Sequence, residues 1–487
     1  MQLRNFTLIF VVALVIALND STLLAQTLQP DPANPRWFIY GSTHLVLSGN
    51  GIWILIPDTD MDIAEHNQHT LTWGGNSNRT SLFSFCHSEE LCPWERTGPG
   101  TANDGKPKYD LDKFNNAYWK RTVQYFQDCV KGGIFPLVQI WGECYVEGGS
   151  QGSDRWNEHP FNPDNNINNI PDLPSGTADA GRDEYFYNTK NKKLMAYQEA
   201  FVTRVLNDLG KFPVIWDIGN EIGLDTQISD RWMRYWADFF DAYQAAYPGI
   251  KILSTVDTNA DRGHYKRINN FDVINVHGVR AARPFRFEDQ PDKDPNHSRV
   301  DVKRMQTALD KQYRLYKKPL VNSRITSDPD RKRNIRDRAG NALEARHILW
   351  GYFFSAAHFI SFRSDKETSW TQQPLTTEHQ QVHLRKFIDS FEFFKCMPRI
   401  TDIVKSDDAV VLAERGRQYA FYAPNGNHFA NRFTADLSEA GNIKFRARWF
   451  NPRKGIFGKP FKVSARSSVK FTLPTDEDWA LLLDRNK

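Results

Sequence analysis

The chain of 487 residues has few cysteines, little net charge and no long apolar run beyond its first 20 residues. Its 62 Lys and Arg nearly balance its 58 Asp and Glu, which leaves a formal net charge of +4. That balance gives no global argument for nucleic-acid binding. No later stretch approaches the roughly 20 apolar residues that a transmembrane helix needs. We therefore expect no nucleic-acid partner and no membrane span in the mature protein.

Motifs for metals and nucleotide cofactors are also missing. The sequence has no HxH or HExxH spacing and no glycine-rich loop of the kind that cradles phosphates, so we expect no metal and no cofactor. Five cysteines leave at least one thiol unpaired. Cys86 and Cys92 are close enough in sequence to close a loop, but the sequence alone does not assign the pairing.

The first 25 residues are typical of a secretory signal peptide. A short basic start at residues 1–5 precedes an almost wholly apolar run at 6–18, and Ala25 supplies a small residue for cleavage. We expect residues 1–25 to be removed and the mature chain to be secreted or periplasmic. An uncleaved membrane anchor is the alternative, although the apolar run is short for a span.

Apolar strand-like runs alternate with amphipathic helical segments, which predicts a parallel α/β fold. Helices are expected at 111–131, 193–209, 229–246, 302–316 and 342–356. Strands are expected at 37–46, 74–85, 134–141, 212–221, 250–257, 271–277, 318–324 and 358–363. Eight strands with interleaved helices in about 360 residues predict a (β/α)8 TIM barrel.

The pattern changes near Met397. Short alternating runs at 409–412, 418–422, 444–450, 469–473 and 479–483 replace the helices, and turn residues separate them. They predict a C-terminal antiparallel β-sandwich. We divide the chain into a signal peptide at 1–25, a barrel at 26–397 and a β-sandwich at 398–487.

The fourth expected strand ends in two polar residues, Asn220 and Glu221. In a parallel barrel the chemistry gathers where the strands end. A carboxylic acid beside an amide is suited to protonating a leaving oxygen while the amide holds a neighbouring hydroxyl. A helix cap or a surface ion pair is the alternative role for Glu221.

The stretch Trp216-Asp-Ile-Gly-Asn-Glu221 resembles glycoside hydrolase clan A, the (β/α)8 retaining glycosidases whose acid/base Glu follows an Asn at the end of strand four. The resemblance extends over about Arg36 to Met397. It implies that Glu221 is the proton donor, that Arg79 reaches into the site to orient the nucleophile, and that His277 lies near the nucleophile, where it could orient the substrate. An internal ion pair for Arg79 and a plain barrel-rim position for His277 are the alternatives.

Trp141, after the third strand, is either a platform for a sugar ring or a core residue. The tracts Tyr419–Gly426 and Arg448–Arg453 resemble the β-sandwich often appended to clan A barrels. A closely similar module carries a collagen-binding label, but nothing in these residues demonstrates collagen binding.

The chain departs from this resemblance at Arg324, which stands where the nucleophilic Glu is expected. A guanidinium is permanently protonated and cannot attack an anomeric carbon. Other second carboxylates near strand ends are Glu143, Asp257 and Asp365, and a more distant base acting on water would invert the configuration. A shifted strand register is a further alternative.

Arg324 itself can clamp a sulfate or carboxylate of an anionic glycan, or pair with an internal carboxylate. Together these features predict an exported glycosidase-like protein that acts on polysaccharide or oligosaccharide. The alternative is a non-catalytic carbohydrate-binding or surface-adhesion protein on the same fold.

Overall fold

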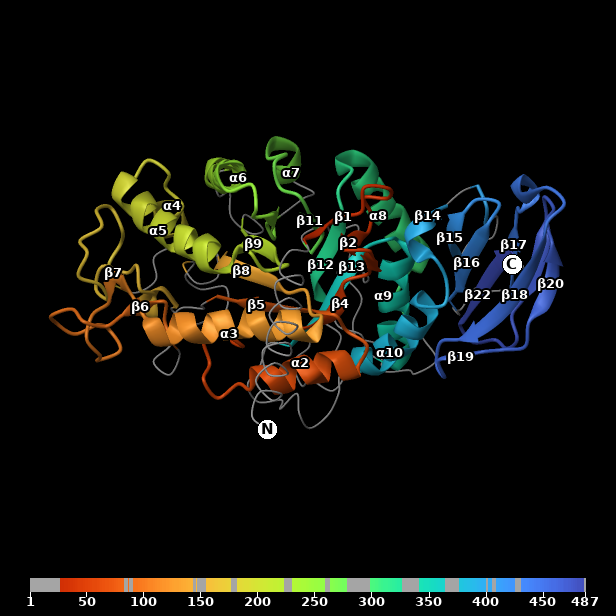
Figure 1. The fold of residues 1–487 in the computed structure, drawn as a ribbon, viewed down its shortest axis with the longest axis horizontal. Coiled ribbons are helices and arrows are strands. Elements are labelled where there is room, and N and C mark those ends of the chain that lie inside the picture. The colour runs from red at the N-terminus through yellow and green to blue at the C-terminus, as the bar shows by residue number, and fades with distance from the viewer. Residues whose placement is uncertain are drawn as a thin grey trace, which may run out of the picture.

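A computed structural model describes residues 27–82, 86, 91–142, 146, 155–176, 182–222, 230–258, 263–277, 298–325, 341–363, 376–399, 402–404, 409–424 and 431–485. A barrel of parallel strands makes up the larger part of the molecule, and an antiparallel β module lies at its C-terminal end (Figure 1).

Eight parallel strands form the wall of the barrel. In order around the wall they are β10 (Leu253–Thr255), β9 (Ile215–Asn220), β8 (Leu137–Gly142), β5 (Ser77–Ser81), β4 (Ser48–Ile52), β13 (His358–Arg363), β12 (Leu320–Ile325) and β11 (Ile274–Asn275). The end strands of this sheet meet through the amides of Asp272 and Val273, which both donate to the Ser254 carbonyl at 3.0 Å. The predicted TIM barrel is confirmed.

Helices follow most of these strands. The long ones are α2 (Ile63–Thr72), α3 (Asn116–Gly132), α5 (Lys192–Leu209), α6 (Asp230–Ala246), α8 (Val302–Tyr316), α9 (Ala342–Phe354) and α10 (Thr376–Ile388), and the short ones are α4 (Arg182–Phe186) and α7 (His264–Arg267). Asn115 caps α3 by accepting from the Ala117 amide at 3.0 Å. The helix therefore begins at 116 and not at the predicted 111, and residues 110–114 form β7 against β6 (Trp94–Glu95).

The prediction of a first barrel strand at 37–46 is wrong. These residues form β2 (Phe38–Tyr40) and β3 (Thr43–Leu45), an antiparallel hairpin that pairs with β1 (Leu28–Pro30). The first barrel strand is β4, whose glycines hide it from a search for apolar runs. Gly49 is required there, because a Cβ atom at this position would lie 1.7 Å from the Ser77 carbonyl oxygen.

The small β1–β2–β3 sheet covers the amino-terminal end of the barrel. Its side chains Leu28, Phe38 and Leu45 pack against a ring of apolar residues inside the barrel: Leu137, Ile215, Leu253, Val273, Val321 and Ile360. This end of the barrel is therefore an apolar floor, and the polar interior lies toward the carboxyl ends of the strands.

His358 ties this floor to the wall in its neutral form. Its Nδ1 accepts from the Leu47 amide at 3.0 Å, so its Nε2 carries the proton that is donated to the Arg36 carbonyl at 3.1 Å. The ring is fully buried. Burial lowers the pKa of His358 to about 3, although the bond to Arg36 opposes this shift.

We expect this ring to make the protein less stable in acid. From about pH 6.5, the ordinary pKa of His, down to about 3, the unfolded chain binds a proton here that the folded chain does not. The contribution of neutral His358 to the free energy of unfolding is therefore fully present above pH 6.5. Below that pH it falls by at most about 1.4 kcal/mol per pH unit. Urea unfolding of the parent and of His358→Gln at several pH values tests this. The stability difference between them should shrink as pH falls, and a constant difference from pH 7 to 4 would contradict the assignment.

The C-terminal module is built from two antiparallel layers. The larger sheet runs β14 (Met397–Pro398), β15 (Val410–Glu414), β16 (Gln418–Ala423), β22 (Trp479–Arg485), β18 (Lys444–Asn451) and β19 (Ile456–Phe457), with β20 (Phe461–Ser464) also paired to β18. The second layer is the ladder of β17 (Arg432–Ala435) and β21 (Val469–Thr472). This arrangement confirms the predicted antiparallel module.

The other face of the larger sheet packs on helices α9 and α10 of the barrel. The ring of Trp350 stacks on Tyr422 with centroids 4.9 Å apart, and Phe387 meets Phe450 at 5.3 Å. Arg346 on α9 forms two hydrogen bonds of 2.8 Å with the Asp478 carboxylate, and both side chains are buried. Burial favours the neutral acid, but Arg346 outweighs it and holds the pKa of Asp478 below its ordinary value. We call this contact the seam.

Candidate active site

Above the apolar floor, the inward positions of the barrel strands are polar. Arg79 on β5, Gln139 on β8 and Asp217 on β9 are at most 1% exposed. Across the barrel, the Asn275 amide donates to the Ser323 hydroxyl at 2.7 Å. The interior thus changes from hydrocarbon to hydrogen-bonding groups toward the carboxyl ends of the strands, where barrel enzymes place their chemistry.

Arg79 connects the groups at this end of the barrel. Its Nη2 donates to Asn220 Oδ1 at 2.6 Å and lies 3.5 Å from an Asp217 oxygen and 3.7 Å from an Asp257 oxygen. Gly51 stands beside it in register, where a Cβ atom would lie 2.8 Å from the Cβ of Arg79. The glycine makes room for the arginine, and the arginine fixes the orientation of the Asn220 amide.

Sequence reasoning missed Asp217 in this network. Burial raises the pKa of Asp217 to about 7, Arg79 opposes this shift and the carboxylate of Asp257 adds to it. Asp217 Oδ1 also accepts from the Asp257 amide at 3.0 Å. The signal was present, because an aspartate in the middle of an otherwise apolar strand must find a partner inside the barrel.

Asp257 holds His277 at the end of the neighbouring strands. The two Asp257 oxygens lie 3.0 and 3.2 Å from His277 Nδ1. The Asp257 side chain is fully buried, whereas that of His277 is 13% exposed. The buried carboxylate therefore orients an imidazole that is itself slightly exposed.

Glu221 is partly exposed and has a strained backbone. Its φ of +59° is in the left-handed region, which L-residues other than Gly, Asn and Asp seldom adopt. Such a conformation costs on the order of 1–3 kcal/mol and is concentrated at functional sites. The next residue, Ile222, donates its amide to the Asp257 carbonyl at 2.8 Å. This bond places the Glu221 segment beside the Asp257–His277 pair.

Trp141 lies in the core. It is 1% exposed, and its ring packs against Phe161, Phe186 and Phe201 with centroids 5.1 to 6.0 Å apart. A sugar ring has no access to this face of the indole. The position favours the core role over the substrate platform.

The structure gives no side-chain position for two candidates for the second catalytic carboxylate, or for Arg324, which stands where the resemblance places that group. Glu143 and Asp365 lie outside the described residues. Arg324 belongs to β12, but only its backbone is described. The register of β12 against β13 shifts between Asn322 and Ile325, so the strand pairing is irregular around Arg324.

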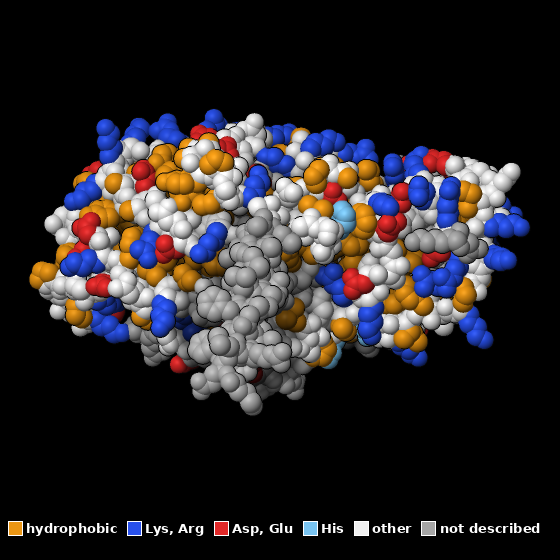
Figure 2. Space-filling view, in the orientation of Figure 1, with side chains coloured by type: hydrophobic (Ala, Val, Ile, Leu, Met, Phe, Trp, Pro, Cys, Tyr) orange, Lys and Arg blue, Asp and Glu red, His pale blue; other side chains and the backbone are white. Residues whose placement is uncertain are grey.

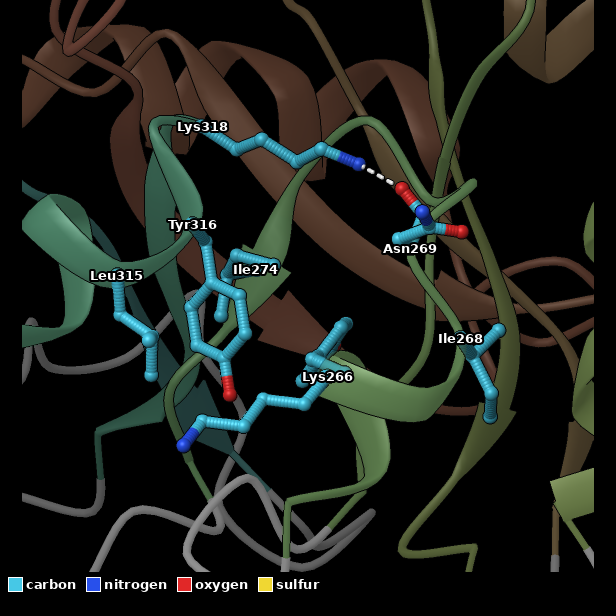
Figure 3. Close-up of a pocket in the computed structure, with 8 residues that line it drawn as sticks. Lys266, Ile268, Asn269, Ile274, Leu315, Tyr316 and Lys318 are labelled. Atoms are coloured by element: carbon cyan, nitrogen blue, oxygen red, sulfur yellow. Dashed lines mark hydrogen bonds between the residues drawn. The ribbon is translucent and has the colours of Figure 1, made fainter.

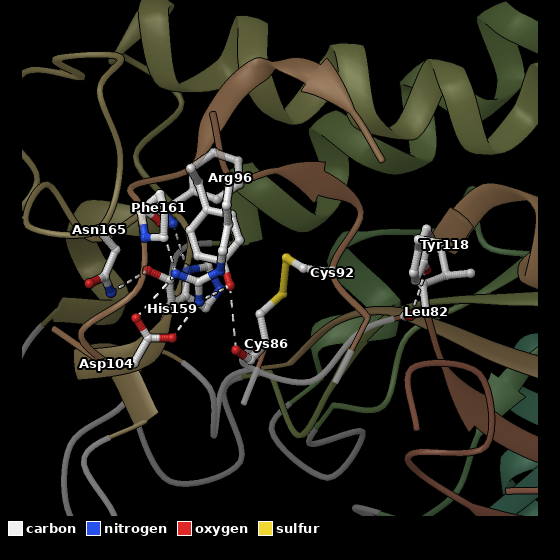
Figure 4. Close-up of a disulfide and its surroundings, with 11 residues drawn as sticks. Leu82, Cys86, Cys92, Arg96, Asp104, Tyr118, His159, Phe161 and Asn165 are labelled. Atoms are coloured by element: carbon white, nitrogen blue, oxygen red, sulfur yellow. Dashed lines mark hydrogen bonds and ion pairs between the residues drawn. A yellow bond between two sulfur atoms is a disulfide. The ribbon is translucent and has the colours of Figure 1, made fainter. Parts of the chain in front are cut away.

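The connections after β5 and β8 pack together into a wall beside the carboxyl end of the barrel. Figure 4 shows the Cys86–Cys92 disulfide and, near it, Arg96, which pairs with Asp104. The Tyr109 amide donates to the Asn165 carbonyl at 2.8 Å, which joins the two connections. Cys129 and Cys396 are free and buried, and Cys144 lies outside the described residues.

One further pocket lies away from this site. It has a volume of about 250 Å³ and is lined by Tyr265, Tyr316 and Lys318 among others (Figure 3). Ile274 at the start of β11 also lines it, so it opens at the amino-terminal end of the wall. The Lys318 ammonium donates to the carbonyls of Asn269 and Phe271. This pocket is therefore separate from Asn220 and Glu221.

Among the described residues, no group of three or more His, Cys, Asp or Glu is arranged to hold a metal ion. No helix in the described ranges is both long and apolar enough to cross a membrane.

Comparisons with known proteins identify the fold to which this site belongs. Residues 89–276 match the family described as "Domain of unknown function (DUF6298)", and residues 399–484 match "Putative collagen-binding domain of a collagenase". No curated protein sequence matches the chain. A solved structure described as "Glycoside hydrolase" superposes with a TM-score of 0.61 at 13% identity, over 95% of this chain and 97% of that one. The chain has the fold of a glycoside hydrolase.

A family 5 glycoside hydrolase from Bacteroides vulgatus superposes with a TM-score of 0.59 at 13% identity, over 94% of this chain and 93% of that one. Both comparisons therefore extend through the barrel and the C-terminal module. On this glycoside-hydrolase fold, β9 ends at the buried Asn220 and is followed by the partly exposed Glu221, while Arg79, Asp217 and Asp257 are buried beside them.

Proposed function

We propose that the protein is an exported glycoside hydrolase that cleaves a polysaccharide or oligosaccharide, with Glu221 as its general acid. The observation that carries the proposal is the strained Glu221 at the end of β9, next to an Asn220 whose amide is fixed by Arg79. The general acid of a glycosidase must reach the glycosidic oxygen from a fixed position. A partly exposed carboxyl group on a constrained strand end meets that requirement.

Asn220 and Arg79 have supporting roles in this proposal. Asn220 is fully buried and its Oδ1 accepts from Arg79, so in this proposal it fixes the end of β9 from which Glu221 extends. Arg79 is fully buried among carboxylates, so it acts as a positioning residue and does not touch the substrate.

The hydrolysis also needs a second catalytic group. Asp257 is fully buried and lies against His277 Nδ1. We propose that this pair activates water as a base in an inverting hydrolysis, with Glu143 and Asp365 as the competing candidates. The stereochemistry of the first-formed sugar, read by proton NMR, separates inversion from retention.

A screen of the purified chain against neutral and sulfated glycans tests the function directly. Release of reducing ends from any of them supports the proposal. Binding without release from every glycan would favour the alternative, a carbohydrate-binding or surface-adhesion protein that has lost hydrolysis. The observation that favours this alternative is Arg324 at the position where the resemblance places the nucleophile.

Arg324→Glu distinguishes the two functions. If Arg324 serves a working, non-standard site, we expect the substitution to lower hydrolysis by about 100-fold or more, because a carboxylate replaces the cation that positions the substrate. Chromatography of the reaction products measures this loss. Hydrolysis with retention that appears in the variant but is absent from the parent would instead mark the parent as a degenerate glycosidase.

Export is proposed from the N-terminal sequence. We expect the mature protein to start near Gln26 and to accumulate outside the cytoplasm, because a basic start, an apolar run and a small residue precede that point. Intact-mass analysis of the exported protein measures the cleavage. A mass that includes residues 1–25 would contradict it.

A further inference from the structure

The C-terminal module carries the positive charge of the chain. Residues 399–485 contain 15 Lys and Arg against 10 Asp and Glu, a net charge of +5, whereas the whole chain carries +4. Figure 2 shows Lys and Arg side chains spread over this module, on the right of the view. The rest of the chain is close to neutral, so the charge of the module requires its own explanation.

Most acidic side chains of the module are already engaged by particular arginines. Ion pairs join Arg415 to Asp402 and Glu439, Arg417 to Glu414, Arg448 to Asp484, and Arg453 to Glu477 and Asp478. By contrast, Lys444, Arg446 and Lys462 are exposed and form no ion pair within the described ranges.

These cations lie together on one face of the larger sheet. Along β18, Phe445 and Ala447 point into the core of the module, so Lys444, Arg446 and Arg448 lie on the opposite face. Lys462 on β20 stands directly opposite Arg446. We call Lys444, Arg446, Arg448 and Lys462 the basic strip. Alternate residues of a strand are about 6.5–7 Å apart, so the charges repeat at that spacing.

The basic strip begins where the seam ends. Phe450, on the same face of β18, packs against Phe387 of the barrel, and the strip continues from there toward the start of the strand. Among the described residues, the acidic side chain on this part of the face is Asp484, which stands opposite Arg446 on β22. Arg448 pairs with it at 3.4 Å. The basic strip therefore lies on the same sheet face as the contact with the barrel and continues that face into solvent.

Like charges directly opposite each other on neighbouring strands repel, so Arg446 and Lys462 are unfavourably placed unless an anion lies over them. A flat sheet face with repeated cations fits an extended polymer better than a small ion. We propose that the basic strip binds an anionic polysaccharide that carries sulfate or uronate groups. The choice of a glycan over other polyanions rests on the function proposed for the barrel.

The test measures binding of the full chain to dextran sulfate and to neutral dextran, which share one backbone. The double variant Arg446→Glu with Lys462→Glu alters the strip. A matched control, Arg432→Glu with Lys470→Glu, makes the same charge change at exposed positions of the β17–β21 ladder. We expect dextran sulfate to bind the Glu221→Gln protein with and without the control substitutions within about twofold of each other. The strip variant should bind at least about tenfold more weakly. The slope of the logarithm of its binding constant against the logarithm of the salt concentration should be lower by about one for each cation contact that is lost.

Equal losses in both variants would assign the binding to net charge and overturn the proposal, as would no loss in either. Binding of an oligothymidylate as tight as that of dextran sulfate would overturn the assignment to a glycan. Thermal midpoints establish that both variants are folded. Because all binding is measured in the Glu221→Gln background, a failure of the strip is distinguishable from a failure of the proposed catalysis.

Discussion

Glu221→Gln is expected to lower hydrolysis of natural glycans by roughly 100- to 10,000-fold while leaving binding nearly unchanged. A glutamine keeps the shape of the side chain, but its amide has no acidic proton to give to the departing oxygen. Sugar leaving groups are poor, so that proton is needed to break the glycosidic bond. Reducing-end release and calorimetric binding, measured on the same preparation, report the two quantities.

An aryl glycoside with an acidic phenol provides the sharpest control for this prediction. Its leaving group departs without protonation, so Glu221→Gln should keep most of its activity on that substrate. The control variant Glu65→Gln makes the same chemical change at an exposed position in the first turn of α2 and should behave as the parent. Full activity of Glu221→Gln on the natural glycan would remove Glu221 from the mechanism.

Arg79→Met is expected to cost about 3–5 kcal/mol of stability. Removing the guanidinium leaves the carboxylates of Asp217 and Asp257 buried in the barrel without a cation. It also releases the Asn220 amide, so we expect any hydrolytic activity to fall with the stability. Urea unfolding followed by far-UV circular dichroism measures the loss.

Two further variants make this prediction specific. Arg417 pairs with Glu414 at the surface and is 65% exposed, so Arg417→Met should cost no more than about 1 kcal/mol. Adding Asp217→Asn to Arg79→Met should restore part of the loss, because one buried charge is then removed. A loss in Arg79→Met as small as in Arg417→Met would show that the buried network contributes little.

Regular periodicity made most of the fold predictable. Helix α8 has the predicted range 302–316, because Asp301 caps it and its apolar residues recur with a helical period. Strand β18 alternates between buried and less buried positions, and strand β22 contains a continuous apolar run. Both strands were predicted. Strands β17 and β20 were not predicted.

The candidate site was predictable only where a residue stands at the end of a strand. Asn220, Glu221, Asp257 and His277 were found in this way. The contacts of Arg79 with Asn220, Asp217 and Asp257 were not predicted, because they depend on which strands are neighbours around the barrel. Each of these contacts joins residues more than 100 positions apart, and no local pattern encodes it.

The seam has a consequence for how the C-terminal module can be studied. Appended modules are often expressed as separate fragments and then assayed for ligands. Here a cut between the two parts would leave Tyr422 and Phe450 facing water and would separate Asp478 from Arg346. A fragment of this kind would adhere to many surfaces, collagen among them, for reasons unrelated to its role in the intact chain. Ligands of this module are therefore best sought with single substitutions in the whole protein.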